Sequence, residues 1–335
     1  MISPSALNAW ETCGRKLAFQ RDPATRALNR PSPRTALGVV AHGLTESAAT
    51  GQPPAGMARR AWLEQEWEQL LAQQVQKLAT AWPGRRIPPV AQWDGLVATR
   101  VRILRKLSAE PEPEMTTAAQ APAGGPGFPW IERRLEDPTA GVFGTPDRVD
   151  VRNGHLRVVD LKSGVHQAGI QDAQRRQLLL YAHLVDVACG QLPAVGVIED
   201  VSGKETSFSI ESVAVTHALH EAQRGASNFN HAIASGEVPA QPDETACRFC
   251  PFRSVCWPYW TSNARSDRDV RGTVIDEPEA SSFKVDVGGA EALRVVITAG
   301  VSVPAREDEV VVLDVVPAGH HTVKMRWNSA LRTPG

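Results

Sequence analysis

Two aspartates and a lysine have the types and spacing of a metal site that could cleave phosphodiesters. Asp147 ends one apolar segment, and Asp160 precedes Lys162 by two positions in the next. A pair of carboxylates suits Mg²⁺ or Mn²⁺, which prefer carboxylate and carbonyl ligands, and the carbonyl of Leu161 is a further candidate. Residues two apart in a strand point to one face, so Lys162 and Asp160 are expected to share a site. A metal ion beside a cation is the combination that phosphodiester hydrolysis requires.

Each of these residues also has a plainer interpretation. An isolated Asp-x-Lys is commonly a surface ion pair, and an aspartate after Thr145-Pro146 is a common turn residue. Gln177 and Tyr181, one helical turn apart, could simply be a packed polar pair. The order in which these residues occur together, rather than any one of them, favours a shared site.

Helices are expected to dominate the first third of the chain. Ser3-Pro4 is a typical helix start, and apolar spacing from Leu7 to Leu17 would place Cys13 on the buried face of the first helix. Further helices are expected over about 35–49, 57–80 and 92–109.

Strands and helices then alternate, which indicates an α/β fold. The turn Asn153-Gly154 is expected to pair two strands and so to bring Asp147 and Asp160 together. The expected strands cover 130–135, 142–151, 156–162, 196–198 and 205–210, and helices cover 171–188 and 217–235.

The last part of the chain has a β pattern of its own. We expect a first domain over 1–262, a polar linker over 263–271 and a small β domain over 272–335. This domain could be an OB-like barrel that holds single-stranded nucleic acid, or a unit for packing or partner docking. The residues suited to stacking and charge in the first case are Phe283, Lys284, Arg294, Lys324, Arg326 and Trp327.

Four of the five cysteines form a candidate metal or cluster site. Cys247, Cys250 and Cys256 are closely spaced, a pattern compatible with zinc or with iron–sulfur chemistry, and Cys13 is the candidate fourth ligand. An odd number of unevenly spaced cysteines fits a reducing compartment better than a disulfide framework. Cys189 lies outside this pattern and is expected to be a small core residue.

In order, the motifs resemble the RecB-like branch of the PD-(D/E)XK nuclease superfamily. The resemblance covers about residues 1–260 and rests on Gly-x-x-Asp-Arg-x-Asp, Val-Asp-x-Lys and Gln-x-x-x-Tyr, with Gly38-x-x-x-His42 upstream. It implies a restriction-endonuclease-like core, with a mixed sheet flanked by helices. It also implies a role for each matching residue: metal ligands His42, Asp147, Asp160 and Leu161, the water-positioning Lys162, and DNA contacts from Gln177, Tyr181 and Arg148. Glu132, on an apolar-flanked stretch two strands upstream, is a candidate neighbour of the site but is not among the predicted ligands.

The cysteines resemble those of cluster-bearing members, the AddB-type and CRISPR-adaptation nucleases. In these proteins one early and three late cysteines hold a [4Fe-4S] cluster, which implies that Cys13, Cys247, Cys250 and Cys256 do so here. Gly14 departs from the proline that usually follows the first cysteine. By ligand type alone, zinc remains the alternative.

Composition sets limits on the function. The net charge of −1 does not exclude DNA binding, because a local basic groove is sufficient for it. No apolar run is long enough to span a membrane. The N-terminus lacks a signal-peptide pattern, so a cytoplasmic location is expected. Ser202-Gly203-Lys204 lacks the upstream glycine of a phosphate-binding loop, so no ATPase is expected.

Three hypotheses about function remain in competition. The first is an active DNA nuclease, an exonuclease rather than an endonuclease, acting on single strands or DNA ends in repair, recombination or defence. The second is an iron–sulfur DNA-binding or scaffolding subunit whose nuclease site is idle, and a zinc-binding structural protein is a third reading. A helicase or another DNA-processing protein is the expected partner.

Overall fold

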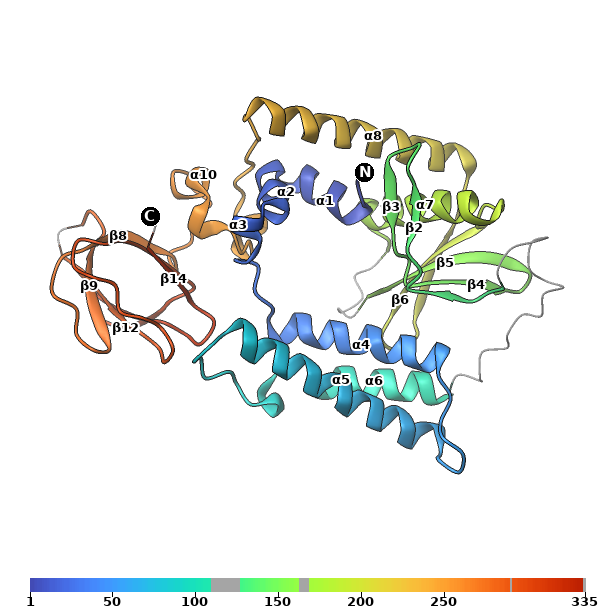
Figure 1. Ribbon diagram of the computed structural model, residues 1–335, viewed down its shortest axis with the longest axis horizontal. Coiled ribbons are helices and arrows are strands. Elements are labelled where there is room, and N and C mark those ends of the chain that lie inside the picture. Colours follow the sequence, from blue (N-terminus) through green and yellow to red (C-terminus); the bar gives the residue numbers. More distant parts are fainter. Residues whose placement is uncertain (110–126, 163–168, 290, 334–335) are drawn as a thin grey trace. The chain divides into compact units, whose positions relative to one another are not determined.

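The protein forms two compact units in a computed structural model that describes residues 1–109, 127–162, 169–289 and 291–333 (Figure 1). The first unit contains Met1–Glu11, Arg34–Gln74 and Asp94–Val238. The second contains Thr12–Pro33, Val75–Trp93 and Pro239–Gly335. Helices and sheets are mixed along the chain, which confirms the α/β class and the additional β sheet at the C-terminal end.

The helices begin and end close to where sequence spacing predicts them. Ser3 caps the first of them, because its hydroxyl accepts a hydrogen bond from the amide of Ala6. Helices that lie wholly or mainly in the first unit are α1 (Pro4–Thr12), α4 (Pro33–Thr50), α5 (Arg59–Ala81), α6 (Leu96–Ala109), α7 (Asp172–Cys189) and α8 (Ser212–Ser235).

A five-stranded sheet forms the centre of the first unit. Its order is β1-β4-β5-β6-β7, and only β5 and β6 run parallel. The strands are β1 (Trp130–Ile131), β4 (Arg148–Arg152), β5 (His155–Lys162), β6 (Val195–Asp200) and β7 (Glu205–Ser209), and a separate pair joins β2 (Leu135–Asp137) to β3 (Val142–Gly144). Asn153 and Gly154 form the predicted turn, with φ of 52° and 77°, and the register sets Arg148 opposite Val159.

Helices cover both faces of this sheet. On one face, Val158 and Ile198 pack with α7 and α8 in an apolar core that includes Leu178. On the other face, Lys106 of α6 reaches Glu199 of β6. Figure 1 shows α8 on one side of the sheet and α4, α5 and α6 on the other.

Paired charges run across the second of these faces. Arg148 donates to both Asp150 and Glu199, and Arg157 donates to both Asp150 and Glu205. Lys106 lies 2.5 Å from Glu199, and both side chains are at most 5% exposed. We call the set Lys106, Glu199, Arg148, Asp150, Arg157 and Glu205 the sheet ion network. Because breaking a buried pair costs about 3–5 kcal/mol, the network fixes β4 to β5 and β6.

The second unit combines short helices with a seven-stranded sheet of order β12-β13-β10-β9-β8-β11-β14. Its helices are α2 (Gly14–Arg21), α3 (Pro23–Arg26), η1 (Val90–Gln92), α9 (Glu244–Arg248), η2 (Arg253–Val255) and α10 (Trp257–Trp260). Its strands are β8 (Val270–Val274), β9 (Ser282–Asp286), β10 (Leu293–Val296), β11 (Glu309–Leu313), β12 (Val316–Gly319), β13 (Thr322–Lys324) and β14 (Ala330–Arg332).

This sheet differs from the OB-like alternative in two respects. It has seven strands, whereas an OB fold has five. Phe283, expected among the stacking residues, is 2% exposed and packs in the core with Val295 and Val310. Phe283 is therefore not available for stacking on a base, because its inward position in β9 is needed to fill the sheet's interior.

Some predicted elements are interrupted. The first helix breaks at Cys13, which has extended backbone (φ −169°, ψ 111°), so this residue is not on a continuous buried helix face. The expected strand over 142–151 divides at 145–147, and β8 starts inside the expected linker over 263–271. In the parts of the chain that the structure describes, no helix is both long and apolar enough to cross a membrane.

Candidate active site

Three potential metal ligands meet beside the end of β4. The Nδ1 atom of His42 lies 3.5 Å from Asp147 Oδ1 and 3.6 Å from Glu132 Oε1. His42 comes from α4, Asp147 from the link between β3 and β4, and Glu132 from the segment after β1. The ligand atoms of all three lie within 4.8 Å of one another, so they could share one ion.

Glu132 was missed as a ligand because its placement depends on backbone geometry that no pattern revealed. The backbone of Glu132 has a φ of 46°, which is unusual for a residue other than glycine. Its amide donates to the carbonyl of Asp147 at 3.1 Å. This break ends β1 and turns the carboxylate toward His42. The apolar residues that flank Glu132 were the only available signal, and they indicated a continuous strand.

Asp160 and Lys162 lie together at the end of β5, as their spacing predicts. Lys162 Nζ is 2.6 Å from Asp160 Oδ2, and the Asp160 side chain is only 4% exposed. Burial raises the pKa of Asp160, the ammonium of Lys162 lowers it and the charge of Asp147 raises it, with a net increase. A divalent ion would offset this cost of keeping the carboxylate ionised.

Gln177 and Tyr181 hold Asp160 from α7. The Gln177 amide donates to Asp160 Oδ1 at 2.8 Å and to the Tyr181 hydroxyl at 3.1 Å. Tyr181 packs against Gly144, where an added Cβ would lie 2.6 Å from its ring. Glycine at position 144 therefore makes room for the tyrosine. The sequence predicts that Gln177 and Tyr181 contact DNA, and this remains a prediction.

Two other predicted site residues have structural partners. The amide of Leu161 donates to Asp147 Oδ2, which fixes the aspartate against β5. The role of the Leu161 carbonyl as a ligand remains a prediction. Arg148 belongs to the sheet ion network, with a side chain 16% exposed, so its guanidinium is engaged within the protein. Its predicted contact with DNA also remains a prediction.

These residues fit a divalent metal ion. Asp160 Oδ2 is buried, and the Lys162 ammonium lies 2.6 Å from it. A buried carboxylate is costly to keep ionised, and a nearby cation lowers that cost. A pocket lined by His42, Leu161, Lys162 and Lys106, among others, adjoins the end of β5. Carboxylates with one imidazole are a suitable ligand set for Mg²⁺ or Mn²⁺.

Binding of a metal ion by His42 should release a proton. The hydrogen bonds to Asp147 and then Glu132 raise the pKa of His42 to about 10, so the imidazole is protonated at pH 7.5 in the metal-free protein. A ligand imidazole must be neutral, so the ion and the proton compete, and metal affinity should rise with pH until about pH 10. Calorimetry with Mn²⁺ in two buffers of different ionisation enthalpy should show about one proton released per ion.

The matched variant for this experiment is His42→Gln, which keeps a polar side chain but cannot carry the proton. Its proton release should fall close to zero. Equal proton release by the variant and the wild-type protein would show that His42 does not exchange its proton for the metal ion.

The second unit contains a pocket lined by four cysteines, Cys13, Cys247, Cys250 and Cys256. Burial raises the pKa values of the Cys250 and Cys256 thiols, and neighbouring cysteines raise them further. Within the described residues, no three cysteine sulfurs lie within 4.8 Å of one another. Cys189 is not among the residues that line this pocket and is half-buried beside the core of the first unit.

A buried arginine holds the loop that carries the late cysteines. Arg253 is 3% exposed and donates to the carbonyls of Cys247, Arg248 and Cys250 at 2.7–3.2 Å. Its other nitrogens reach Asp269 at 2.7 Å and Asp314 at 2.8 Å, next to the strands β8 and β11. Arg253 thus fixes the cysteine loop to the seven-stranded sheet.

Replacing Arg253 with methionine should destabilise the second unit. Asp269, whose side chain is 0% exposed, would lose its cation, and removal of one partner from a buried pair costs about 3–5 kcal/mol. Denaturant unfolding measures this loss. Arg248→Ala is the control, because Arg248 is an exposed cation on the same loop and should change stability by less than about 0.5 kcal/mol. Similar losses for both variants would contradict the role of Arg253.

The sequence profile of the PD-(D/E)XK nuclease superfamily matches residues 1–257. The chain belongs to this superfamily. No curated protein gives a significant match over the sequence.

Solved structures show weaker similarity. The crystal structure of SSO0001 is 13% identical and has a TM-score of 0.31, with 68% of this chain and 97% of that chain covered. A protein of Eubacterium rectale, provisionally described as an exonuclease, is 12% identical with a TM-score of 0.38, and the match covers 83% of this chain and 90% of that one.

Proposed function

We propose that the protein is a metal-dependent deoxyribonuclease that hydrolyses phosphodiester bonds. The observation that carries the proposal is the group His42, Glu132 and Asp147, whose ligand atoms could share one ion. Asp147 is joined by a hydrogen bond to β5, where the buried Asp160 pairs with Lys162. A structural ion pair alone would leave no need for an imidazole and further carboxylates nearby. Membership of a nuclease superfamily supports the same reaction.

Each side chain has a separate task in this mechanism. Asp147, Asp160, His42 and Glu132 would hold Mg²⁺ or Mn²⁺, which when bound polarises the phosphate and lowers the pKa of the attacking water. Lys162 positions that water and offsets the negative charge that develops on the phosphate. Gln177 orients the Asp160 carboxylate through its 2.8 Å hydrogen bond. Leu161 fixes Asp147 through its backbone amide.

We further propose DNA single strands or DNA ends as the substrate, and exonuclease rather than endonuclease action in repair, recombination or defence. A helicase or another DNA-processing protein is the proposed partner, in the cytoplasm. The resemblance to RecB-like nucleases supports these assignments. The alternative is an idle subunit that binds DNA, and the full set of acidic, basic and imidazole side chains favours the active enzyme.

The direct test uses end-labelled single-stranded, linear duplex and circular DNA, with Mn²⁺, with Mg²⁺ and with chelator. The active enzyme should degrade linear strands from their ends and leave circles intact. Cleavage of circles would indicate an endonuclease. DNA binding without cleavage under any of these conditions would favour the idle subunit.

The four-cysteine pocket is proposed to hold a [4Fe-4S] cluster. Four thiolates that bind one zinc ion at about 2.3 Å must lie about 3.8 Å apart. Each thiolate of a cluster binds a different iron atom, so the sulfurs lie farther apart. The shared pocket supports a common site for the four cysteines, and the resemblance to cluster-bearing nucleases favours the cluster over zinc.

A further inference from the structure

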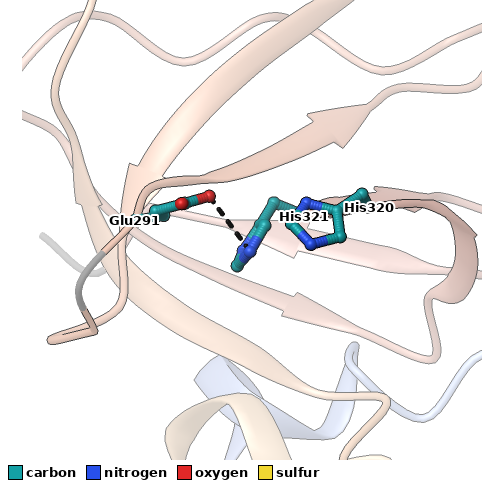
Figure 2. A group of neighbouring side chains, drawn as sticks. All are labelled: Glu291, His320 and His321. Carbon is teal, nitrogen blue, oxygen red and sulfur yellow. Dashed lines mark ion pairs between the residues drawn. The ribbon is translucent and has the colours of Figure 1, made fainter.

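A second group of potential metal ligands lies on the seven-stranded sheet, in the second unit. Figure 2 shows His320 and His321 from the link between β12 and β13, next to Glu291. The ligand atoms of the three side chains lie within 4.8 Å of one another, and His321 Nε2 is 3.0 Å from Glu291 Oε2. All three side chains are exposed, so an ion could reach them from solvent.

The sheet holds the two segments of this group side by side. Strands β10 and β13 pair in parallel, with Arg294 opposite Thr322. Glu291 precedes β10 and His321 precedes β13, so the pairing brings both residues to the same end of the sheet. A hydrogen bond of 2.8 Å from the Arg294 amide to the His321 carbonyl closes this end. The ligands are therefore positioned by backbone pairing and not only by flexible side chains.

The backbone also brings the two histidine rings together. The side chains of neighbouring residues in a strand point to opposite faces. His320 and His321 lie in the turn between β12 and β13, where His321 has a φ of 49°, in the left-handed region. Their two ring centroids are therefore only 4.2 Å apart. The short turn between β12 and β13 accounts for this conformation, because two-residue links between paired strands favour a positive φ. The turn thus holds both rings on one side of the sheet's end, beside Glu291.

We propose that Glu291, His320 and His321 form a binding site for a zinc ion. Ligand atoms about 2.1 Å from a tetrahedral zinc ion lie about 3.4 Å apart, and the His321–Glu291 separation of 3.0 Å is close to this value. Two imidazoles and one carboxylate suit zinc, whereas the carboxylate-rich group around Asp147 suits Mg²⁺ or Mn²⁺. The three ligands leave the fourth position of the ion for water.

The test measures zinc stoichiometry in the full-length protein by equilibrium dialysis and metal analysis, with excess Mg²⁺ present. The wild-type chain should bind one zinc ion more than the His320→Ala/His321→Ala variant. Glu291→Gln, which removes one ligand charge and keeps the side-chain volume, should weaken this ion at least about tenfold. Melting curves followed by circular dichroism check that the variants are folded.

The matched control is His217→Ala. His217 is an exposed histidine, 71% accessible, that lies 3.6 Å from Glu221 on α8. This pair resembles His321–Glu291 but is not part of a group of three ligands among the described residues. The control should bind as much zinc as the wild-type protein.

Equal zinc stoichiometry in the wild-type protein, the double variant and Glu291→Gln would overturn the proposal and leave an ordinary surface ion pair. Should the double variant fail to fold, Glu291→Gln decides the outcome alone. The measurement involves no DNA, so its result is independent of the proposed nuclease activity.

Discussion

Replacing Lys162 with alanine is expected to lower the rate of DNA cleavage at least about a hundredfold without unfolding the protein. The ammonium is 2.6 Å from Asp160 and is proposed to stabilise the charge that develops on the phosphate. Its loss has a second effect, because Lys162 lowers the pKa of the buried Asp160. Without it that pKa should rise, so a larger fraction of the carboxyl is protonated and metal binding requires a higher pH.

The measurement is the cleavage rate of labelled DNA as a function of pH, with Mn²⁺ present. The remaining activity of Lys162→Ala should have its acidic limb at higher pH than that of the wild-type protein. Lys204→Ala is the control, because Lys204 is an exposed lysine between β6 and β7 of the same unit. Wild-type cleavage by Lys162→Ala would show that this lysine is only an ion-pair partner. We expect Asp160→Asn and Asp147→Asn to be inactive as well.

Replacing Cys13 or Cys250 with serine is expected to remove the proposed cluster and to lower the melting temperature by about 10 °C. Cys13 and Cys247 are more than 230 positions apart, and closing so long a loop removes about 5 kcal/mol of chain entropy from the unfolded state. Serine is a poor ligand for iron and cannot keep the loop closed. Iron and sulfide analysis of anaerobically purified protein, with a melting curve, provides the test.

Cys189→Ser is the matched control for the cysteine variants. Cys189 is half-buried at the end of α7 in the first unit, so this variant should keep its iron, its colour and its activity. A full iron complement and an unchanged melting temperature in Cys13→Ser would show that the late cysteines take their fourth ligand elsewhere. Zinc in place of iron and sulfide in the wild-type protein would overturn the cluster assignment.

Local sequence signals were sufficient for much of the fold. Ser3-Pro4 starts α1 and Asn153-Gly154 makes the turn between β4 and β5, because each pair fixes its own backbone without help from distant residues. That turn sets the register, and the register places Asp147 next to β5. The proximity of Asp147 to β5 could therefore be derived from two strands and one turn.

Features that depend on distant contacts could not be derived. Glu132 joins the site because the chain leaves β1 with a positive φ, supported by a hydrogen bond to Asp147. The internal partners of Arg148 come from β4 itself and from β6, 51 positions away. Neither the strand pattern nor the motif indicates that the guanidinium pairs with Asp150 and Glu199.

The sheet ion network gives the protein two different responses to ionic strength. Salt screens exposed charges over about 8 Å at physiological concentration and weakens contacts between a protein and DNA phosphates steeply. Lys106 and Glu199 are almost completely shielded from solvent, so mobile ions cannot enter between them. Concentrated salt should therefore release the substrate while the sheet beneath the site remains intact, which makes inhibition by salt reversible on dilution.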